Sequence, residues 1–341
     1  MHKSEFKSAL SGLSDNIPVW FMRQAGRYLP SYMKVRRNKS IKEICANPDL
    51  ISQISYSPVE DIGVDASIIF YDITLPFEAM GFNLDFMEKV GPVITPKTNS
   101  RIGHNYDPDK DKYALEPGIR LFKERHPDTF LYGFVGGPIT LASYIIAGSS
   151  DRDLEKTIHF MMKEESRFSE LMDRILEMII TISKKQINAG AGAIQIFDSW
   201  AGSLPYGLFD LYLNKYLQPL SSEISKYAFN VYFSTRTGSY AKELSKTEFD
   251  FLSMDSRSLL SYIHSTCKFE KGMQGNLDPV YTTLSPEVAL SETRRILDDA
   301  KLIDRYVFNL GHGVLPTSNV ECLKEIVKMV HTYGKKIKLS L

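Results

Sequence analysis

The chain has 341 residues, of which 43% are hydrophobic and 24% are charged, a composition typical of a soluble globular protein. Its 41 lysines and arginines balance its 41 aspartates and glutamates, so no overall positive charge is present to attract nucleic acid. No signal-peptide pattern opens the chain, and its most apolar helical stretch is broken by Asp173, Arg174 and Glu177, which excludes a membrane span there. Three scattered cysteines without a CxxC pair favour a reducing compartment, and we expect a cytoplasmic protein.

Short apolar runs that end in a small or polar residue recur along the chain and predict strands. They cover residues 18–22, 65–70, 131–135, 193–197, 230–234, 249–254, 272–276 and 306–310. Amphipathic segments with helical spacing lie between most of these runs. Strands that alternate with helices indicate parallel strands joined by right-handed crossovers.

Eight such units favour the α/β class and a (β/α)8 barrel of the TIM type. Such a barrel needs about 250 residues, so we expect insertions, among them a hairpin in the glycine- and proline-punctuated residues 84–104. The length is compatible with one large domain or with two. We treat residues 1–341 as a single barrel domain. An open doubly wound sheet is the alternative, although no GxGxxG follows the first run.

Barrel enzymes carry their active sites at the C-terminal ends of the strands, so the residues that follow each run are candidates. In chain order they are Arg23 and Arg27, Asp72, Gly136 to Pro138 with Tyr144, Asp198 and Ser199, Thr235 and Arg236, Asp255, Asp278, and His312. One rim would therefore hold arginines, carboxylates, a tyrosine, a serine and a histidine.

Several of these candidates also have a purely structural explanation. Ser199 could cap the next helix, and Asp72 could cap a short turn before Pro76. Tyr144 could pack within a helix with its hydroxyl in water, and His312 could be an ordinary loop histidine. Both explanations stay open for each residue.

The stretch PVWFMRQAGRYLP at residues 18–30 places two guanidinium groups directly after an apolar strand. Burying a guanidinium is costly unless it is paired. We therefore interpret Arg23 and Arg27 as an anion-binding loop at the rim.

Other kinds of site lack their motifs. The chain has no HxH, no HExxH and no cysteine pair at ligand spacing, and His264 with Cys267 has no evident third ligand. No GxSxG is present, and GFVGGP lacks the GK[ST] ending of a phosphate-binding loop. The sequence thus predicts no metal site.

Taken together, these segments resemble the uroporphyrinogen decarboxylase family. PVWFMRQAGRYLP resembles the family's N-terminal signature, and GFVGGPITLASY resembles its second signature. IFYDITLPFEAMG, IFDSWAG, QGNLDP and NLGHGVLP are similar to further family blocks, in the family's order. The resemblance covers residues 18 to 320, nearly the whole chain.

The resemblance implies a distorted (β/α)8 barrel that forms a homodimer and uses no metal or organic cofactor. The implied reaction converts the four acetate side chains of uroporphyrinogen III to methyl groups, giving coproporphyrinogen III in haem biosynthesis. By matching position, the implied substrate-binding residues are Arg23, Gln24, Ala25, Gly26, Arg27, Asp72, Tyr144, Ser199 and His312. The implied catalytic residues are Asp72, Arg23, Arg27, Tyr144 and His312.

The chain departs from the family pattern at several positions. Gly137 stands where alanine is expected, Ile139 where an aromatic residue is expected, and Ser318 where proline is expected. Ser256 follows Asp255 where the family commonly has tryptophan. These departures affect the expected pocket shape and not the reaction class.

The implied chemistry suits these residue types. Arginine binds carboxylates bidentately and stays protonated, and Gly26 would let the backbone of residues 24–27 approach a carboxylate. The Asp72 carboxylate could accept from pyrrole N–H groups and stabilise a protonated, iminium-like ring, which would serve as the electron sink for decarboxylation. Arg23 is the candidate proton donor, whereas Tyr144 and His312 would bind and orient carboxylates.

Two other functions stay open at this point. One is a zinc-dependent methyltransferase of the same superfamily, which acts with corrinoid proteins and needs thiolate or imidazole ligands near the C-terminal strands. The corresponding segments here, VYFSTRTG and MQGNLD, contain neither cysteine nor histidine. The other is a tetrapyrrole-binding protein without catalytic activity, which would need the arginines and His312 but not Asp72.

Overall fold

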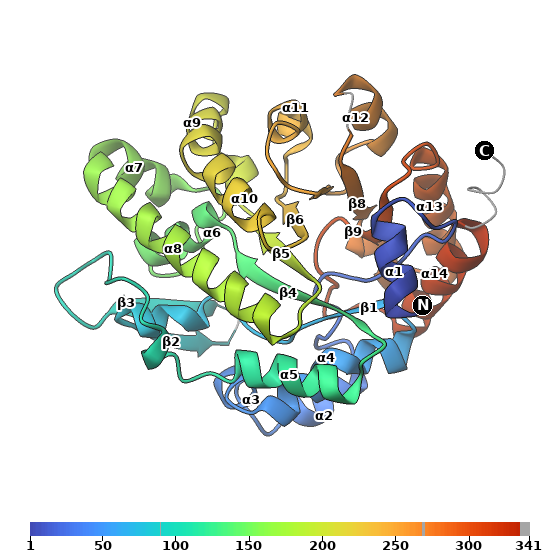
Figure 1. Ribbon diagram of the computed structural model, residues 1–341, viewed down its shortest axis with the longest axis horizontal. Coiled ribbons are helices and arrows are strands. Elements are labelled where there is room, and N and C mark those ends of the chain that lie inside the picture. Colours follow the sequence, from blue (N-terminus) through green and yellow to red (C-terminus); the bar gives the residue numbers. More distant parts are fainter. Residues whose placement is uncertain (89, 268–269, 335–341) are drawn as a thin grey trace.

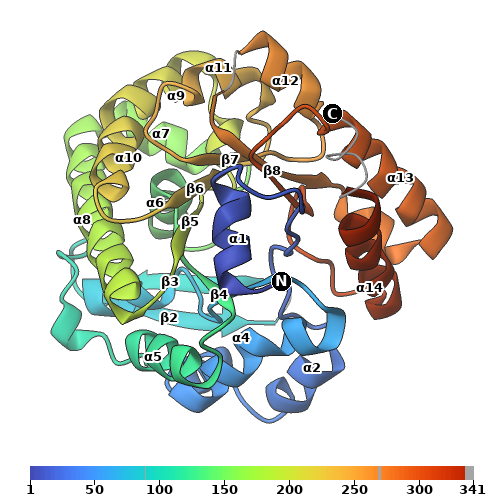
Figure 2. The same cartoon turned by 45° about the vertical axis from the view of Figure 1, so that its right-hand side comes forward.

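The structure, a computed structural model, describes residues 1–334 apart from residue 89 and residues 268–269. In this part of the chain, seven parallel strands form one curled sheet in the order β1-β4-β5-β6-β7-β8-β9, with helices around it (Figures 1 and 2). These strands are β1 (Ala66–Ile68), β4 (Phe130–Gly136), β5 (Ala193–Phe197), β6 (Asn230–Phe233), β7 (Phe251–Ser253), β8 (Gly272–Leu277) and β9 (Tyr306–Leu310). The predicted α/β class and TIM-type barrel are confirmed, and seven of the predicted runs contain strands.

The first predicted strand, residues 18–22, closes the barrel without forming a regular strand. Val19 forms an isolated parallel bridge with Phe308 of β9, and its carbonyl accepts from the Asp65 N–H at 2.8 Å on the other side. Two backbone N–H groups that would pair with a neighbouring strand donate to side chains instead. Val19 N–H donates to the Asp65 carboxylate at 2.8 Å, and Met22 N–H donates to Asn309 Oδ1 at 3.0 Å. The segment therefore bridges β9 and β1 but cannot extend the ladder.

The helices cover the outside of the barrel and one of its ends. They are α1 (Lys3–Leu10), α2 (Pro30–Arg36), α3 (Ile41–Cys45), α4 (Pro48–Ile62), α5 (Leu115–Arg125), α6 (Pro138–Ala147), α7 (Glu155–Lys163), α8 (Glu165–Ala189), α9 (Tyr206–Tyr212), α10 (Gln218–Ser225), α11 (Ala241–Leu244), α12 (Leu260–Thr266), α13 (Pro286–Asp299) and α14 (Val320–Met329). Helix α1 lies across the N-terminal end of the strands, where Lys3 N–H donates to Asp128 and Arg305 donates to the Leu10 carbonyl (Figure 2). No helix in the described residues is long and apolar enough to cross a membrane.

The predicted insertion is an antiparallel hairpin. Strands β2 (Phe82–Met87) and β3 (Gly91–Pro96) pair from Phe82 with Pro96 to Met87 with Gly91, slightly earlier than predicted. The hairpin forms a separate two-stranded sheet beside the barrel (Figure 1).

A polar layer lies inside the barrel. The buried amide of Gln274 donates to Gln195 Oε1 at 3.1 Å and to Ser253 Oγ at 3.0 Å. Its oxygen accepts from the Trp20 indole N–H at 3.0 Å. These polar atoms pair with one another, so none of the bonds leaves a buried partner unsatisfied. The layer thereby joins β5, β7 and β8 to residues 18–22, which close the barrel.

Asp198, predicted at the rim, is a buried structural residue. One carboxylate oxygen accepts from Thr140 N–H in the first turn of α6, and the other accepts from the hydroxyls of Tyr212 and Tyr232. The carboxylate supplies the N-terminal cap that Gly137 cannot provide. A Cβ at Gly137 would lie 2.1 Å from Asp198 Cβ, which explains glycine at this departure from the family pattern.

We predict that Asp198→Ala lowers the free energy of unfolding by about 3 kcal/mol, because it leaves buried hydroxyl and N–H donors without an acceptor. Denaturant unfolding measures this change. The matched control is Asp85→Ala, on the exposed side of β2, which should change stability by less than about 0.5 kcal/mol. Equal effects of the two substitutions would contradict the structural role of Asp198.

Candidate active site

A cavity of about 360 Å³ opens at the C-terminal ends of the strands. The loop after the closing segment, the end of β1 and the loop after β9 supply most of its wall. Of the predicted site residues, those that line it are Arg23, Gln24, Ala25, Gly26, Arg27, Asp72, Ser199 and His312. Phe134, Phe197 and Phe233 supply apolar wall from β4, β5 and β6. The cavity therefore combines aromatic surface with a charged edge.

Buried hydrogen bonds hold the arginine loop. Gln24 is fully buried, its oxygen accepts from Phe21 N–H at 3.1 Å, and its amide donates to the Ala66 carbonyl of β1 at 3.0 Å. Met22 O accepts from Val314 N–H at 2.9 Å, which ties the loop to the segment after β9. Gln24 thus contributes mainly by fixing the loop's position.

Arg23 stands in an unusual backbone conformation, with φ of +58°. This left-handed region is costly for residues other than glycine, so the surrounding bonds must hold it there. The Arg23 side chain crosses Gly313, where a Cβ would lie 2.4 Å from Arg23 Cδ. The second glycine of NLGHG is therefore required for the passage of the arginine side chain.

The two guanidinium groups are exposed and available to a ligand. Within the described residues, neither Arg23 nor Arg27 forms an ion pair or hydrogen bond through its side chain. The backbone N–H groups of residues 25–27 likewise have no acceptor in the described part of the chain. The loop can therefore offer both charged and backbone donors to an anion.

Asp72 is half-buried, and in the described residues only one of its two carboxylate oxygens accepts hydrogen bonds. Its Oδ1 accepts from Thr74 N–H at 2.8 Å and from Thr74 Oγ1 at 2.6 Å. The structural explanation, a turn cap, is thus correct for one oxygen and leaves the other for a ligand. Burial raises the pKa of Asp72, whereas the Thr74 bonds and the charge of Arg23 oppose this rise.

His312 lies between Gly311 and Gly313, and neighbouring atoms leave no room for a side chain at either glycine. A Cβ at Gly311 would lie 2.4 Å from Ser256 N. The imidazole packs edge-on to Phe233 with ring centroids 6.0 Å apart. Burial, with the charges of Arg23 and Arg152 next in importance, lowers the pKa of His312 to about 4. The imidazole is therefore neutral at neutral pH.

Ser199 and Tyr144 differ in their relation to the cavity. Ser199 lines the cavity, and its hydroxyl does not cap the following helical turn. Tyr144 does not line the cavity, and its ring lies 4.9 Å from that of Trp200. Burial and the nearby charge of Asp72 raise the pKa of Tyr144 to about 12, so its hydroxyl is protonated at neutral pH.

The departures from the family pattern lie outside the cavity lining. Ile139 is fully buried, and Ser256 Oγ donates to Asp278 at 2.8 Å. Ser318 is buried and shares a 2.6 Å hydrogen bond with Thr282. None of them changes the residues that face the cavity.

Sequence reasoning missed two residues that shape this site. Asn309, within NLGHG, accepts from Met22 N–H and so helps to position Arg23; its place beside His312 was the available signal. Arg152 lies far from any predicted strand end, yet its charge acts on both His312 and Tyr144. No motif marked it.

The arrangement is suited to a polyanion with a flat or puckered apolar ring system. Arginines and free N–H groups gather at one edge, aromatic rings line the wall, and one carboxylate oxygen at Asp72 is uncommitted. The residues do not fit a metal centre, since no group of three His, Cys, Asp or Glu in the described residues could hold an ion.

We predict that His312→Asn reduces the loss of stability in acid. Because the native pKa of about 4 lies below the ordinary 6.5, the unfolded chain binds a proton that the native state does not. Wild-type stability therefore falls as pH drops from about 6.5 to about 4, and the variant lacks this contribution. Unfolding titrations at about pH 7 and about pH 4.5 compare the two. Equal losses in both proteins would contradict the prediction.

Comparison with known proteins supplies the family. A family model described as uroporphyrinogen decarboxylase (URO-D) matches residues 1–333. The chain is 42% identical to the uroporphyrinogen decarboxylase of Thermoplasma acidophilum over 331 residues, which cover 96% of this chain and 98% of the relative. It is 37% identical to that of Aquifex aeolicus, covering 93% of this chain and 94% of the relative.

Among solved structures, the fold is similar to a methyltransferase from Methanosarcina mazei, with a TM-score of 0.79 and 20% identity over 97% of this chain and 98% of that one. At this identity the likeness concerns the fold alone. The match across residues 1–333 and the full-length relatives are decisive, and the chain belongs to the uroporphyrinogen decarboxylase family.

Proposed function

We propose that this protein decarboxylates the four acetate side chains of uroporphyrinogen III to methyl groups, giving coproporphyrinogen III and carbon dioxide in haem biosynthesis. Membership of the family supports the reaction. The observation that carries it in the structure is the juxtaposition of Asp72, Arg23 and Arg27 around one cavity; among the described residues, one Asp72 oxygen and both guanidinium groups have no partner.

The arginine loop would bind the carboxylates of the substrate. Arg23 and Arg27 offer bidentate guanidinium groups, and the backbone at Ala25 and Gly26 offers N–H donors. A Cβ at Gly26 would lie 3.2 Å from the Arg23 carbonyl, so glycine keeps this turn open. The ligand, and not the protein, would then pair both charges.

Asp72 would supply a hydrogen-bond acceptor at the centre of the substrate, where the arginine loop supplies donors at its edge. Its free oxygen can accept from pyrrole N–H groups, and its charge stabilises the cationic ring that forms during reaction. The apolar wall around it lowers the local dielectric, which strengthens this interaction. Asp72 is thus the proposed catalytic residue with the clearest role.

The reaction balances without an external electron acceptor. A proton adds to the ring carbon next to the one that bears the acetate, giving an iminium-like ring. The bond to the carboxylate breaks, carbon dioxide leaves, and the electron pair forms an exocyclic methylene group. A proton then adds to the methylene carbon, and the ring carbon protonated in the first step loses its proton. Each decarboxylation therefore consumes one proton.

The remaining residues are assigned to binding and proton delivery. Arg23 is the proposed donor of the first proton, although arginine is ordinarily a weak acid. Neutral His312 can donate its one N–H to a substrate carboxylate, and Ser199 adds a hydroxyl at the cavity wall. Tyr144 would orient carboxylates at the cavity edge.

The zinc-dependent methyltransferase alternative has little support. The donor set in the described residues does not fit zinc, and the likeness to a methyltransferase concerns the fold alone. Non-catalytic tetrapyrrole binding would leave the position of Asp72 unexplained. From the family we also propose a cytoplasmic homodimer.

We predict that Asp72→Asn lowers kcat by about 100-fold or more while the protein stays folded, because the amide cannot stabilise the cationic ring. Coproporphyrinogen formation under anaerobic conditions measures the activity, and thermal unfolding checks the fold. Asp85→Asn, an exposed aspartate on β2, is the matched control and should keep wild-type activity. Near-normal turnover in folded Asp72→Asn would remove Asp72 from the mechanism.

We predict that Thr74→Val moves the acidic limb of the pH profile of kcat/KM toward higher pH. The substitution removes the 2.6 Å hydrogen bond that stabilises the ionised Asp72, so the pKa of that carboxyl rises further. Thr293→Val, at a buried threonine of α13 with a hydrogen bond to Ala289, is the control and should leave the limb unchanged. A shift toward lower pH, or no shift, would contradict the prediction.

A further inference from the structure

The proposed substrate presents more carboxylates than the cavity edge described so far can hold. Uroporphyrinogen carries eight carboxylates around four pyrroles, whereas the cavity of about 360 Å³ is at the small end for ligand pockets. Both arginines that line it come from one loop, after the closing segment. Side chains on the pyrroles away from that loop must therefore extend over another part of the rim.

The loops after β5, β6, β7 and β9 form that part of the rim, and they are joined in a row. The Ser199 carbonyl accepts from Thr235 N–H at 3.3 Å and from its hydroxyl at 2.7 Å. Next in the row, the buried Asp255 accepts from Arg236 N–H at 2.8 Å. The backbone at residues 255–256 in turn packs against Gly311, directly before His312. The row thus runs from one cavity-lining residue to another.

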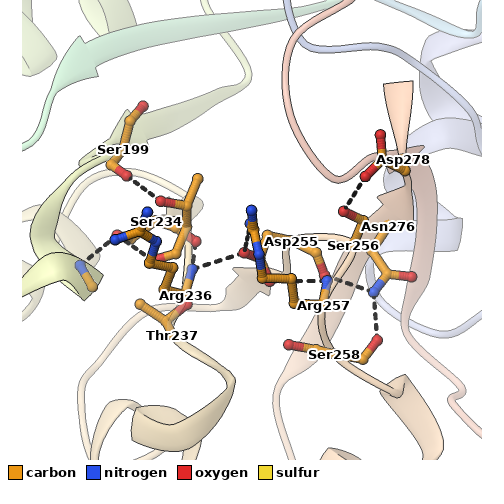
Figure 3. Close-up of polar contacts among 12 residues, drawn as sticks. Ser199, Ser234, Arg236, Thr237, Asp255, Ser256, Arg257, Ser258, Asn276 and Asp278 are labelled. Atoms are coloured by element: carbon orange, nitrogen blue, oxygen red, sulfur yellow. Dashed lines mark hydrogen bonds and ion pairs between the residues drawn. The ribbon is translucent and has the colours of Figure 1, made fainter. Parts of the chain in front are cut away.

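Two arginines project from this row. Figure 3 shows Arg236 and Arg257 on either side of Asp255. The backbone N–H groups of both donate to the Asp255 carboxylate, and so does the Arg257 guanidinium, at 3.1 Å. Arg236 adopts a left-handed backbone with φ of +61°, held by its bond to Asp255. Asp255 is therefore a positioning residue that places both arginines on the rim.

A third arginine joins the same edge. Ser203 Oγ donates to the Arg152 carbonyl at 3.1 Å and accepts from the Arg236 guanidinium at 3.4 Å. The charge of Arg152 is felt by both His312 and Tyr144, which places this arginine within electrostatic reach of the cavity. Arg152, Arg236 and Arg257 thus follow one another along the β5 to β9 side.

Acidic residues lie close to Arg236 and Arg257, yet both guanidinium groups stay largely in solvent. The Arg236 and Arg257 side chains are 52% and 67% exposed. Asp153 lies 3.8 Å from Arg236 but is 85% exposed, so solvent weakens that pair. Asp255 is the single buried carboxylate among the contacts of Arg236 and Arg257 in the described residues, and it is shared between them. Asp278, which accepts from Ser256 at 2.8 Å, lies on the same edge, so the edge carries mixed charge and presents the guanidinium groups of Arg236 and Arg257 to solvent.

We propose that Arg152, Arg236 and Arg257 form a second carboxylate-binding rim, which holds the acid side chains of the pyrroles farthest from Asp72. The inference rests on the proposed function, since the ligand is the same substrate. These arginines do not touch the reacting pyrrole and serve affinity and orientation. As each pyrrole in turn occupies the position over Asp72, the rim holds the others.

The test is the double variant Arg236→Gln with Arg257→Gln. We expect KM for uroporphyrinogen to rise about tenfold and kcat for the first decarboxylation to stay within about twofold. The salt dependence of kcat/KM should become shallower, because two positive charges that attract the substrate are gone. Arg236→Lys with Arg257→Lys should restore most of the affinity, which a merely structural role would not predict.

The matched control is Arg295→Gln on α13, whose side chain is also 52% exposed and pairs with Glu292. It should leave KM and the salt dependence unchanged. Glutamine at position 236 carries the same backbone requirement as arginine, and thermal unfolding verifies that the variants fold. An unchanged KM in the folded double variant, or a fall in kcat alone, would overturn the inference.

Failure of the proposed function gives a different result. In that case wild-type protein makes no coproporphyrinogen under anaerobic conditions, whatever the rim variants do. A binding titration with uroporphyrinogen, monitored by the quenching of tryptophan fluorescence, then tests the rim alone. A tenfold weaker dissociation constant in the glutamine double variant supports the rim, and equal dissociation constants overturn it.

Discussion

The hydrogen bonds that tie residues 18–22 between β9 and β1 are the constraint on which the site depends. They close the barrel, yet Asp65 and Asn309 take the N–H groups of Val19 and Met22, so the strand ends directly before Arg23. The chain then turns through a left-handed residue and exposes two guanidinium groups at the cavity. The same hydrogen bonds therefore close the barrel and position the anion-binding loop. Loss of the bond to Asp65 or of the bond to Asn309 would disturb both.

Within the described residues, no acidic side chain pairs with Arg23 or Arg27 at the site. The chain as a whole is neutral, but two arginines, Arg23 and Arg27, line the cavity beside an aromatic wall. His312 stays neutral because burial and two neighbouring guanidinium groups disfavour its protonation. A polyanionic ligand would supply the negative charge that pairs with Arg23 and Arg27. The positive charge of these arginines would attract such a ligand.

The sequence predicted seven strands, and eight of its nine predicted substrate-binding residues line the cavity, because both follow local patterns. Apolar runs mark strands, and barrel geometry brings the residues after them to one rim. It could not identify the partners of those residues. The donors to Asp198 come from positions 14, 34 and 58 residues away, and Tyr144 packs its ring 4.9 Å from that of Trp200. Arg152, on a loop after α6, acts on His312 through its charge, and no strand-end rule covers that loop.

Three carboxylates that follow strands show what separates a structural aspartate from a catalytic one. Both oxygens of Asp198 are taken by buried donors, and both oxygens of Asp255 are taken by the backbone and side chain of the rim arginines. Asp72 uses one oxygen for Thr74 and keeps the other free beside the cavity. All three are aspartates that follow a strand closely, by four, one and two residues for Asp72, Asp198 and Asp255. The count of uncommitted acceptors is what differs, and only long-range contacts determine it.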